Sequence, residues 1–261
     1  MQSDAPSRPS VAVAIPAYNE ADGIGDFICE IDAALHPHAR SLTLVVVDDA
    51  STDATANVLD QLRGSLHGAL QVVVNSRNRG HGPSLLTAYH RALEQQPDYV
   101  LAVDGDGQFA GADLRRLLVL LIDQAHAVSG VRRFRQDPWF RMAMTRLLRV
   151  YVRASFDVGA RDPNSPLRGY EASLLSELMA RLPGGCLIPN LYLTILAAQR
   201  GLALLEVDVS HRVRRGGSAV GSTWGRGSRS PVPWRLVRFS LAALRESRAF
   251  RAGLGRPRRG A

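Results

Sequence analysis

Short apolar runs alternate with amphipathic helical segments through the N-terminal part of the chain, and this alternation constrains the fold more than any other feature. The runs cover residues 11–15, 42–47, 71–74 and 99–103. Each run is bounded by polar or turn-forming residues, as expected for buried strands. Strands that alternate with helices over short connections predict a single α/β domain, with a mostly parallel sheet flanked by helices.

Helical spacing is clearest in residues 22–35, where five apolar side chains fall on one face. A second helix is predicted over residues 83–93, because proline suits the first helical turn. Asp53 is expected to cap the helix that follows the second apolar run. The remaining predicted elements are helices over residues 140–156, 191–199 and 231–250 and a strand over residues 202–209.

A cluster of unusual polar residues follows each of the four apolar runs. The clusters cover residues 18–20, 48–49, 78–82 and 104–106. In open α/β sheets, ligands bind at the carboxyl ends of the strands. Four such clusters on one predicted edge favour a binding site over four unrelated turns.

The fourth cluster carries oxygen side chains at alternate positions: Asp104, Asp106 and Gln108. Gly105 and Gly107 allow the tight turn that brings them together. Three such oxygen donors suit a hard divalent cation, Mg²⁺ or Mn²⁺, which can also hold the phosphates of a substrate. Taken alone, the stretch is equally compatible with an acidic turn that binds nothing.

Charge is distributed unevenly between the two halves of the chain. Residues 1–130 contain 8 Arg against 16 Asp and Glu, whereas residues 131–261 contain 24 Arg against 8, and the chain has no lysine. A basic half suits phosphorylated substrates or an anionic membrane surface. Because no recognisable nucleic-acid module accompanies it, we expect no nucleic acid partner.

The cysteine count and the length of the apolar runs bear on where the protein works. Two cysteines suggest no disulfide framework and a reducing compartment. The longest aliphatic run, residues 117–122, is too short to span a bilayer. We therefore expect a cytoplasmic protein, with peripheral contact at the inner face of the membrane.

The motifs at residues 15–20, 46–53, 78–82 and 104–108 resemble those of family 2 glycosyltransferases of the GT-A fold. The likeness is greatest to the dolichyl/polyprenyl-phosphate mannosyltransferase-like branch. It spans residues 11–211, which we expect to form the GT-A domain. Residues 1–10 are expected to be a flexible tail. Residues 212–261 are expected to be a basic, Gly- and Arg-rich extension that ends in an amphipathic helix.

This resemblance implies roles for individual residues. It implies that Asp104, Asp106 and Gln108 hold the metal, and that Asp106, Asp162 and Arg212 act in catalysis. The nucleotide-sugar would be bound by Pro16, Tyr18, Glu20, Asp48, Asp49, Asp104, Arg132, Arg168 and Arg214. The family's arginine pattern at residues 211–218 has one extra residue before the serine here, which leaves open whether Arg212, Arg214 or Arg215 binds the phosphate.

The resemblance further implies an inverting, metal-dependent transfer from a UDP- or GDP-linked sugar, most simply to a polyprenyl phosphate. Asp162 and Arg168 are candidates for acceptor contact, although Pro166 and Leu167 replace the family's Gly-Phe there. A phosphate acceptor is already ionised and needs no general base. A hydroxyl on a small metabolite, lipid or antibiotic precursor would need one, with Asp162 the first candidate and His81 the second.

Two other classes of protein remain open at this point. A nucleotidyltransferase also reads nucleotides on an α/β sheet, but it would ordinarily carry a Gly-rich basic loop after the first strand, where residues 16–20 stand here. A non-catalytic nucleotide-sugar-binding module would not need the intact acidic cluster. Metal-dependent turnover would exclude the non-catalytic module.

Overall fold

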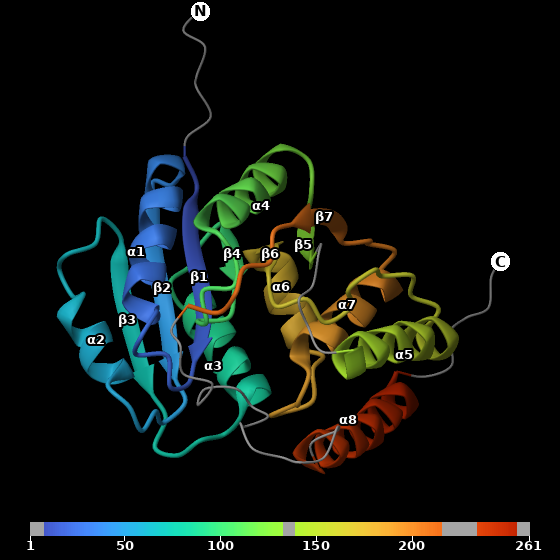
Figure 1. The fold of residues 1–261 in the computed structure, drawn as a ribbon. Helices are drawn as coiled ribbons and strands as arrows, with labels where there is room; N and C mark the ends of the chain where they lie inside the picture. Colours follow the sequence, from blue (N-terminus) through green and yellow to red (C-terminus); the bar gives the residue numbers. More distant parts are fainter. Residues whose placement is uncertain (1–7, 133–138, 216–233, 255–261) are drawn as a thin grey trace, which may run out of the picture.

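The computed structural model describes residues 8–132, 139–215 and 234–254 (Figure 1). At its centre is a seven-stranded sheet with the order β3-β2-β1-β4-β6-β5-β7. The strands are β1 (Ser10–Ala17), β2 (Ser41–Asp48), β3 (Ala69–Val74), β4 (Tyr99–Ala102), β5 (Ala127–Arg132), β6 (Arg168–Glu171) and β7 (Leu205–Val209). All four apolar runs that predicted strands are strands.

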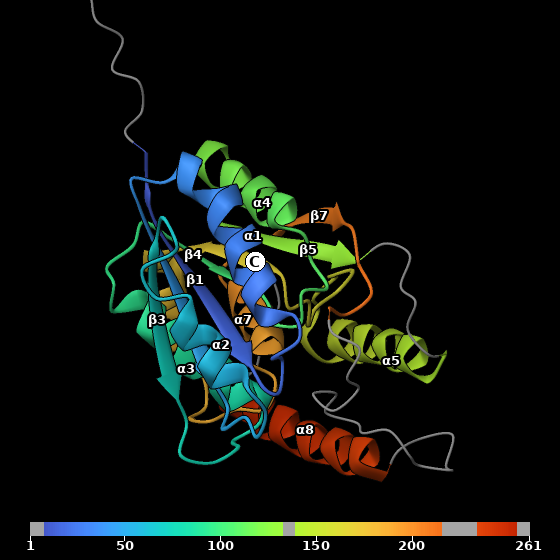
Figure 2. The same cartoon turned by 60° about the vertical axis from the view of Figure 1, so that its left-hand side comes forward.

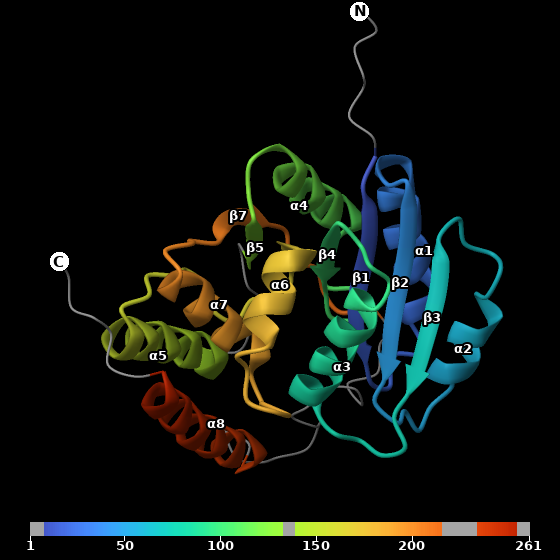
Figure 3. The same cartoon turned by 180° about the vertical axis from the view of Figure 1, so that it is seen from behind.

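Helices cover both faces of the sheet. They are α1 (Ile24–Leu35), the 3-10 helix η1 (His36–His38), α2 (Thr55–Gln61), α3 (His81–Leu93), α4 (Gly111–Asp123), α5 (Trp139–Phe156), α6 (Ala172–Met179), α7 (Pro189–Gln199) and α8 (Trp234–Gly253). Helices α1 and α4 pack on one face, and α3, α6 and α7 pack on the other (Figures 1 and 3). Two apolar cores result, one on each side of the sheet.

The central strands are buried on both faces, which explains why they read as continuous apolar runs rather than alternating ones. Every residue of β1 after Ser10 is buried. Strand β1 pairs in parallel with β2 and with β4. The carboxyl ends of these three strands therefore point to the same edge of the sheet.

Several boundaries and the direction of one strand differ from the sequence predictions. Helix α3 begins at His81, two residues before Pro83, so the proline lies in the first turn but does not start it. Strand β7 begins at Leu205 rather than at residue 202. Strand β6 runs antiparallel to both neighbours, β4 and β5, and it was not predicted because no apolar run marks it in the sequence. The sheet is thus mostly, but not wholly, parallel.

Helices α5 and α8 lie side by side next to α7 (Figures 1 and 2). The hydroxyls of Tyr151 on α5 and Ser247 on α8 are 3.0 Å apart. The ring of Phe250 packs on Tyr192 of α7, with 4.4 Å between centroids. In the described part of the chain, no helix is long and apolar enough to cross a membrane. Residues 1–7 and the Gly/Ser-rich residues 216–227, predicted as loose segments, lie outside the described residues.

Candidate active site

The loops after β1, β2 and β4 meet at one edge of the sheet. The backbone hydrogen bonds of the strands continue past their ends: Pro16 O accepts from Gly105 N at 3.1 Å, and Ala17 O accepts from Asp49 N at 2.9 Å. Pro16 is buried at the end of β1, and Tyr18 follows it half-buried. These three polar clusters are therefore neighbours, as the strand order required, and the fourth, residues 78–82, joins them through Asp49 and Asp104.

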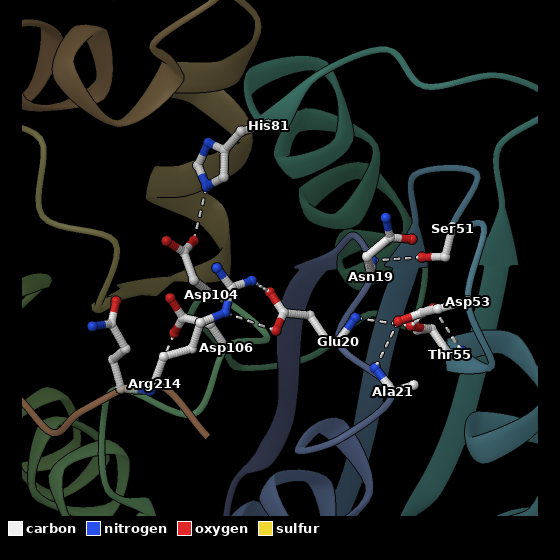
Figure 4. Close-up of polar contacts among 11 residues, drawn as sticks. Asn19, Glu20, Ala21, Ser51, Asp53, Thr55, His81, Asp104, Asp106 and Arg214 are labelled. Atoms are coloured by element: carbon white, nitrogen blue, oxygen red, sulfur yellow. Dashed lines mark hydrogen bonds and ion pairs between the residues drawn. The ribbon is translucent and has the colours of Figure 1, made fainter. Parts of the chain in front are cut away.

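Side chains of the β2 loop fix the backbone of the β1 loop (Figure 4). Ser51 Oγ accepts from Asn19 N at 2.9 Å, and Thr55 Oγ1 accepts from Glu20 N at 2.9 Å. Asn19 and Ala50 have φ angles of 53° and 59°, in the left-handed region that non-glycine residues rarely adopt. Backbone held in this region indicates loops whose shape is set before any ligand arrives.

Asp48 and Asp49 are both buried, and their carboxylates hold loops in place. Asp48 Oδ1 accepts from Ser51 N at 2.9 Å. Asp49 accepts from Arg79 N and from Gly80 N, both at 2.8 Å, and thereby shapes the turn that leads into α3. Direct contact of either aspartate with the nucleoside stays a prediction, while their loop-holding bonds are visible.

Asp104 and Asp106 lie close enough to affect each other's ionisation. Gly107 has a φ of 67°, and Asp106 Oδ1 accepts from Gln108 N at 3.1 Å, which closes the turn after β4. Desolvation and the neighbouring charge of Asp104 raise the pKa of Asp106 to about 6. Two carboxylates that disfavour each other's charge are the environment in which a divalent cation binds well.

His81 is the group whose positive charge opposes the negative charge of Asp104. Its Nε2 lies 2.8 Å from Asp104 Oδ1. Desolvation works against charge on both groups, but their mutual attraction prevails, so the pKa of His81 is raised and that of Asp104 is lowered. No group of three or more His, Cys, Asp or Glu side chains among the described residues is arranged to hold a metal. A cation at Asp104 and Asp106 would therefore take its remaining ligands from Gln108, water and substrate phosphates, as Mg²⁺ commonly does.

Arg214 brings the C-terminal part of the chain into the site. Its guanidinium binds the carboxylate of Glu20 through two hydrogen bonds, beside Asp104 and Asp106 (Figure 4). Burial raises the pKa of Glu20 to about 7, and the two aspartates add to the effect while Arg214 opposes it. The charge of Arg214 also acts to lower the pKa of Asp104 and of Asp106. Arg214 is thus placed where a diphosphate held by the aspartates would lie.

Residues 212–215, which we call the arginine strap, lie across the turn after β4. Arg212 N donates to Gln108 O at 2.8 Å, and Arg215 N donates to Asp106 O at 3.1 Å. A side chain at Gly107 would collide with Arg215, whose Cδ would be 2.8 Å from the added carbon. Only a glycine at 107 lets the strap approach this closely.

The structure places the side chain of Arg212, which was predicted to act in catalysis, against Glu30. The guanidinium of Arg212 lies 3.2 Å from both carboxylate oxygens of Glu30 on α1. Arg215 also binds Glu30. The pKa of Glu30 is lowered because these two charges and the Gly111 amide outweigh its desolvation. Arg214, by contrast, has its guanidinium beside the aspartates (Figure 4).

Arg132 and Asp162 form a second pair at the site. Arg132 ends β5, and its Nε and Nη2 are each 2.9 Å from Asp162 Oδ2. The charge of Arg132 acts to lower the pKa of Asp104. Arg168, which was predicted to bind the nucleotide-sugar, is fully buried, and its guanidinium is hydrogen-bonded to protein oxygens.

Glu30, Thr55 and Asn75 have roles in the site that sequence reasoning did not find. Glu30 holds the strap, Thr55 holds the Glu20 backbone, and Asn75 donates to Asp49 Oδ1 at 2.8 Å. Asn75 directly follows β3, so its place at a strand end was an available signal. Glu30 lies within a helix, so its position in the sequence offered no such signal.

Comparison with known proteins identifies one matching family, and the similar proteins that it finds are sugar transferases by name. The model of the family named Glycosyl transferase family 2 matches residues 12–178. The chain is 27% identical over 218 residues to the undecaprenyl-phosphate 4-deoxy-4-formamido-L-arabinose transferase of Edwardsiella ictaluri, which covers 83% of this chain and 64% of that protein. It is 26% identical over 209 residues to the protein of that name from Pseudomonas fluorescens, covering 80% and 59%. The chain thus spans about three fifths of the length of these curated relatives.

Solved structures share the fold. Glucosyl-3-phosphoglycerate synthase from Mycobacterium tuberculosis, in complex with Mn²⁺, UDP-glucose and phosphoglyceric acid, matches with a TM-score of 0.66 and 19% identity over 94% of this chain and 80% of that chain. A mannosyltransferase from Pyrobaculum calidifontis, in complex with GDP-Man and Mn²⁺, matches with a TM-score of 0.60 and 23% identity over 92% and 65%. The predicted GT-A fold is confirmed. Since the family model covers well over half of the chain, this protein belongs to glycosyl transferase family 2.

Proposed function

We propose that the protein transfers a sugar, with inversion, from a nucleotide-diphosphate sugar to a polyprenyl phosphate, with Mg²⁺ or Mn²⁺ as cofactor. One observation carries the proposal: Asp104 and Asp106 lie beside the guanidinium of Arg214 at the carboxyl edge of the sheet. Carboxylates that bind a cation, next to a fixed arginine, form a site for a diphosphate.

The chemistry of the leaving group determines which protein groups the donor-binding part of the site needs. When the sugar leaves, the nucleoside diphosphate gains negative charge, and the metal supplies neutralisation of that charge when bound. Arg214 can bind phosphate oxygens through its planar fork. The strap backbone holds it there, because Arg212 N and Arg215 N donate to the turn that carries the aspartates.

Two observations support a phosphate acceptor. The curated relatives act, by name, on undecaprenyl phosphate. Asp162 is held by Arg132, so its carboxylate is already engaged at the side of the site where an acceptor would arrive. A phosphate needs no proton removed, and Arg132 offers it a cation. The acceptor oxygen would attack the anomeric carbon directly.

A membrane-resident acceptor also fits the surface of α5 and α8. Leu147 and Val150 on α5 are 68% and 67% exposed, and Trp234 and Leu241 on α8 are 69% and 50% exposed. Helix α5 contains four arginines and no acidic residue, and α8 contains five arginines and one glutamate. Exposed apolar side chains among arginines suit the interface of an anionic membrane. We infer peripheral contact through these two helices.

A screen tests the proposed function. Nucleotide sugars based on UDP and GDP are incubated with the protein and Mg²⁺ or Mn²⁺, with and without polyprenyl phosphate, and release of nucleoside diphosphate is measured. We expect release that requires both the metal and the lipid phosphate. Binding of nucleotide sugar without any turnover would instead support a non-catalytic module.

A hydroxyl acceptor is the second candidate, and Asp162 favours it. A buried carboxylate at the predicted acceptor position is the group that a hydroxyl would need as a base. Transfer to a soluble small molecule, with none to polyprenyl phosphate in the same screen, would select this alternative.

A further inference from the structure

Arg168 is a charged side chain enclosed entirely by protein, at 0% exposure. Its guanidinium donates four hydrogen bonds, to Ser165 O at 2.8 Å, Pro163 O at 2.8 Å, Thr194 Oγ1 at 2.7 Å and Tyr170 Oη at 3.1 Å. All four acceptors are neutral oxygens. Burying a charge away from water is costly unless its hydrogen bonds are made, and here nearly all of them are.

Two of these bonds determine where Arg168 acts. Pro163 O and Ser165 O belong to the loop formed by residues 162–166, so one guanidinium fixes two of its carbonyl groups. The same carbonyls also accept from α7: Thr194 Oγ1 donates to Pro163 O, and Asn190 Nδ2 donates to Ser165 O, both at 3.0 Å. The inner side of the loop is therefore tied to a rigid helix and to a buried cation.

The loop connects Arg168 with the candidate active site. Asp162 at its start is bound by Arg132, whose charge acts on Asp104. At the other end, Arg168 begins β6 and lies opposite Ala102 in the antiparallel register with β4, two residues before Asp104. The loop thus lies between Arg132 at the end of β5 and the start of β6, and its shape sets the position of Asp162.

We infer that Arg168 is a positioning residue, which fixes the 162–166 loop so that Asp162 and Arg132 present a preformed surface to the acceptor. The geometry of the four bonds requires a guanidinium: its donors diverge in one plane and reach four oxygens of different residues at once. The acceptor half of the inference rests on the proposed function. The loop-clamping half does not.

The Arg168→Lys variant tests it, since an ammonium keeps the charge but has three donors on one atom and cannot span the four acceptors. Hydrogen exchange of the 160–168 peptide should become about tenfold faster or more, because the carbonyl clamp is lost. If loop position governs the acceptor, kcat/KM for polyprenyl phosphate should fall about 10- to 100-fold, mainly through KM. Calorimetric affinity for UDP or GDP with Mn²⁺ should change less than about twofold, because this side chain does not reach the donor.

Leu178→Ala is the matched control, because Leu178 is fully buried in α6 and is none of the hydrogen-bond partners of Arg168. It should lower the melting temperature without speeding exchange in the 160–168 peptide or altering the acceptor KM. Combining Arg168→Lys with Asp162→Asn should cost no more than the larger single effect, since both act through one loop.

Unchanged exchange of the 160–168 peptide in Arg168→Lys would overturn the clamp. Equal loss of acceptor and nucleotide binding would show a merely structural role and would also overturn the inference. A wild-type protein that binds neither UDP nor GDP with Mn²⁺ would refute the proposed function instead, and the exchange measurement would still decide the clamp.

Discussion

Arg214 binds Glu20 across 194 positions of the chain, with Nε 3.1 Å from Oε2. This pair joins the arginine strap to the loop after β1, and it lies beside the two aspartates that we assign to the metal. Glu20 already accepts two hydrogen bonds from the guanidinium of Arg214. The diphosphate of a donor must therefore share Arg214 with Glu20 or replace Glu20 on it. Arg214 therefore both holds the arginine strap against Glu20 and binds the proposed ligand.

Replacing Arg214 by lysine should weaken binding of a nucleoside diphosphate with Mn²⁺ by about 10- to 100-fold, because the two-pronged fork to phosphate is lost. Isothermal titration calorimetry measures this directly. Arg200→Lys is the matched control, since Arg200 pairs with Glu177 at the surface, and the affinity of this variant should equal that of wild type. Equal affinities for Arg214→Lys and wild type would remove Arg214 from the donor site.

Affinity for Mn²⁺ should depend on pH around the raised pKa of Asp106, about 6. Below this pH the carboxyl carries a proton that the cation must displace, so affinity should fall about tenfold per pH unit, and above it affinity should level off. Titration of Mn²⁺ between pH 5 and 7.5 shows the change. A flat profile over that range would mean that Asp106 does not lose a proton on metal binding.

Replacing Asp162 by alanine separates the two acceptor classes. With polyprenyl phosphate as acceptor, the variant should keep a rate within about tenfold of wild type, since an ionised phosphate needs no base. Single-turnover transfer at saturating acceptor is the measurement. A near-complete loss of rate would favour a hydroxyl acceptor with Asp162 as its base.

Removing apolar contacts from α8 should weaken attachment to anionic vesicles. Trp234 and Leu241 are exposed on this helix, so their joint replacement by alanine takes apolar area from the proposed interface without disturbing the core. Cosedimentation with vesicles rich in phosphatidylglycerol should fall at least about threefold. Ile122→Ala on α4 is a control at another exposed apolar position, and it should bind as wild type does. Unchanged cosedimentation of the double variant would exclude α8 from membrane contact.

The sequence predicted the part of the fold that local patterns determine. Continuous apolar runs identify strands buried on both faces, and the polar residues that follow them identify the edge where ligands bind. The residues at the ends of β1, β2 and β4 therefore come together as expected. The antiparallel strand β6 could not be predicted, because its four residues carry no distinctive pattern.

Two arginines predicted at the site, Arg168 and Arg212, bind other parts of the protein, for a shared physical reason. Arg168 and Arg212 look like phosphate ligands because arginines are usually exposed, and sequence does not show which of them find partners inside the protein. Their partners, Pro163 and Ser165 for one and Glu30 for the other, lie on elements whose relative positions only the folded chain defines. Glu30 itself was missed because an acidic residue on a helix ordinarily faces water.

The central claim is that Asp104 and Asp106 hold the cation that stabilises a departing nucleoside diphosphate. The most direct test is Mn²⁺-dependent release of nucleoside diphosphate by the Asp106→Asn variant, beside Asp123→Asn, an exposed aspartate at the end of α4, as control. We predict that Asp106→Asn loses turnover by at least about 100-fold with its circular dichroism unchanged, whereas the control keeps wild-type activity. Full turnover by Asp106→Asn, or by wild type in the presence of EDTA, would contradict the account.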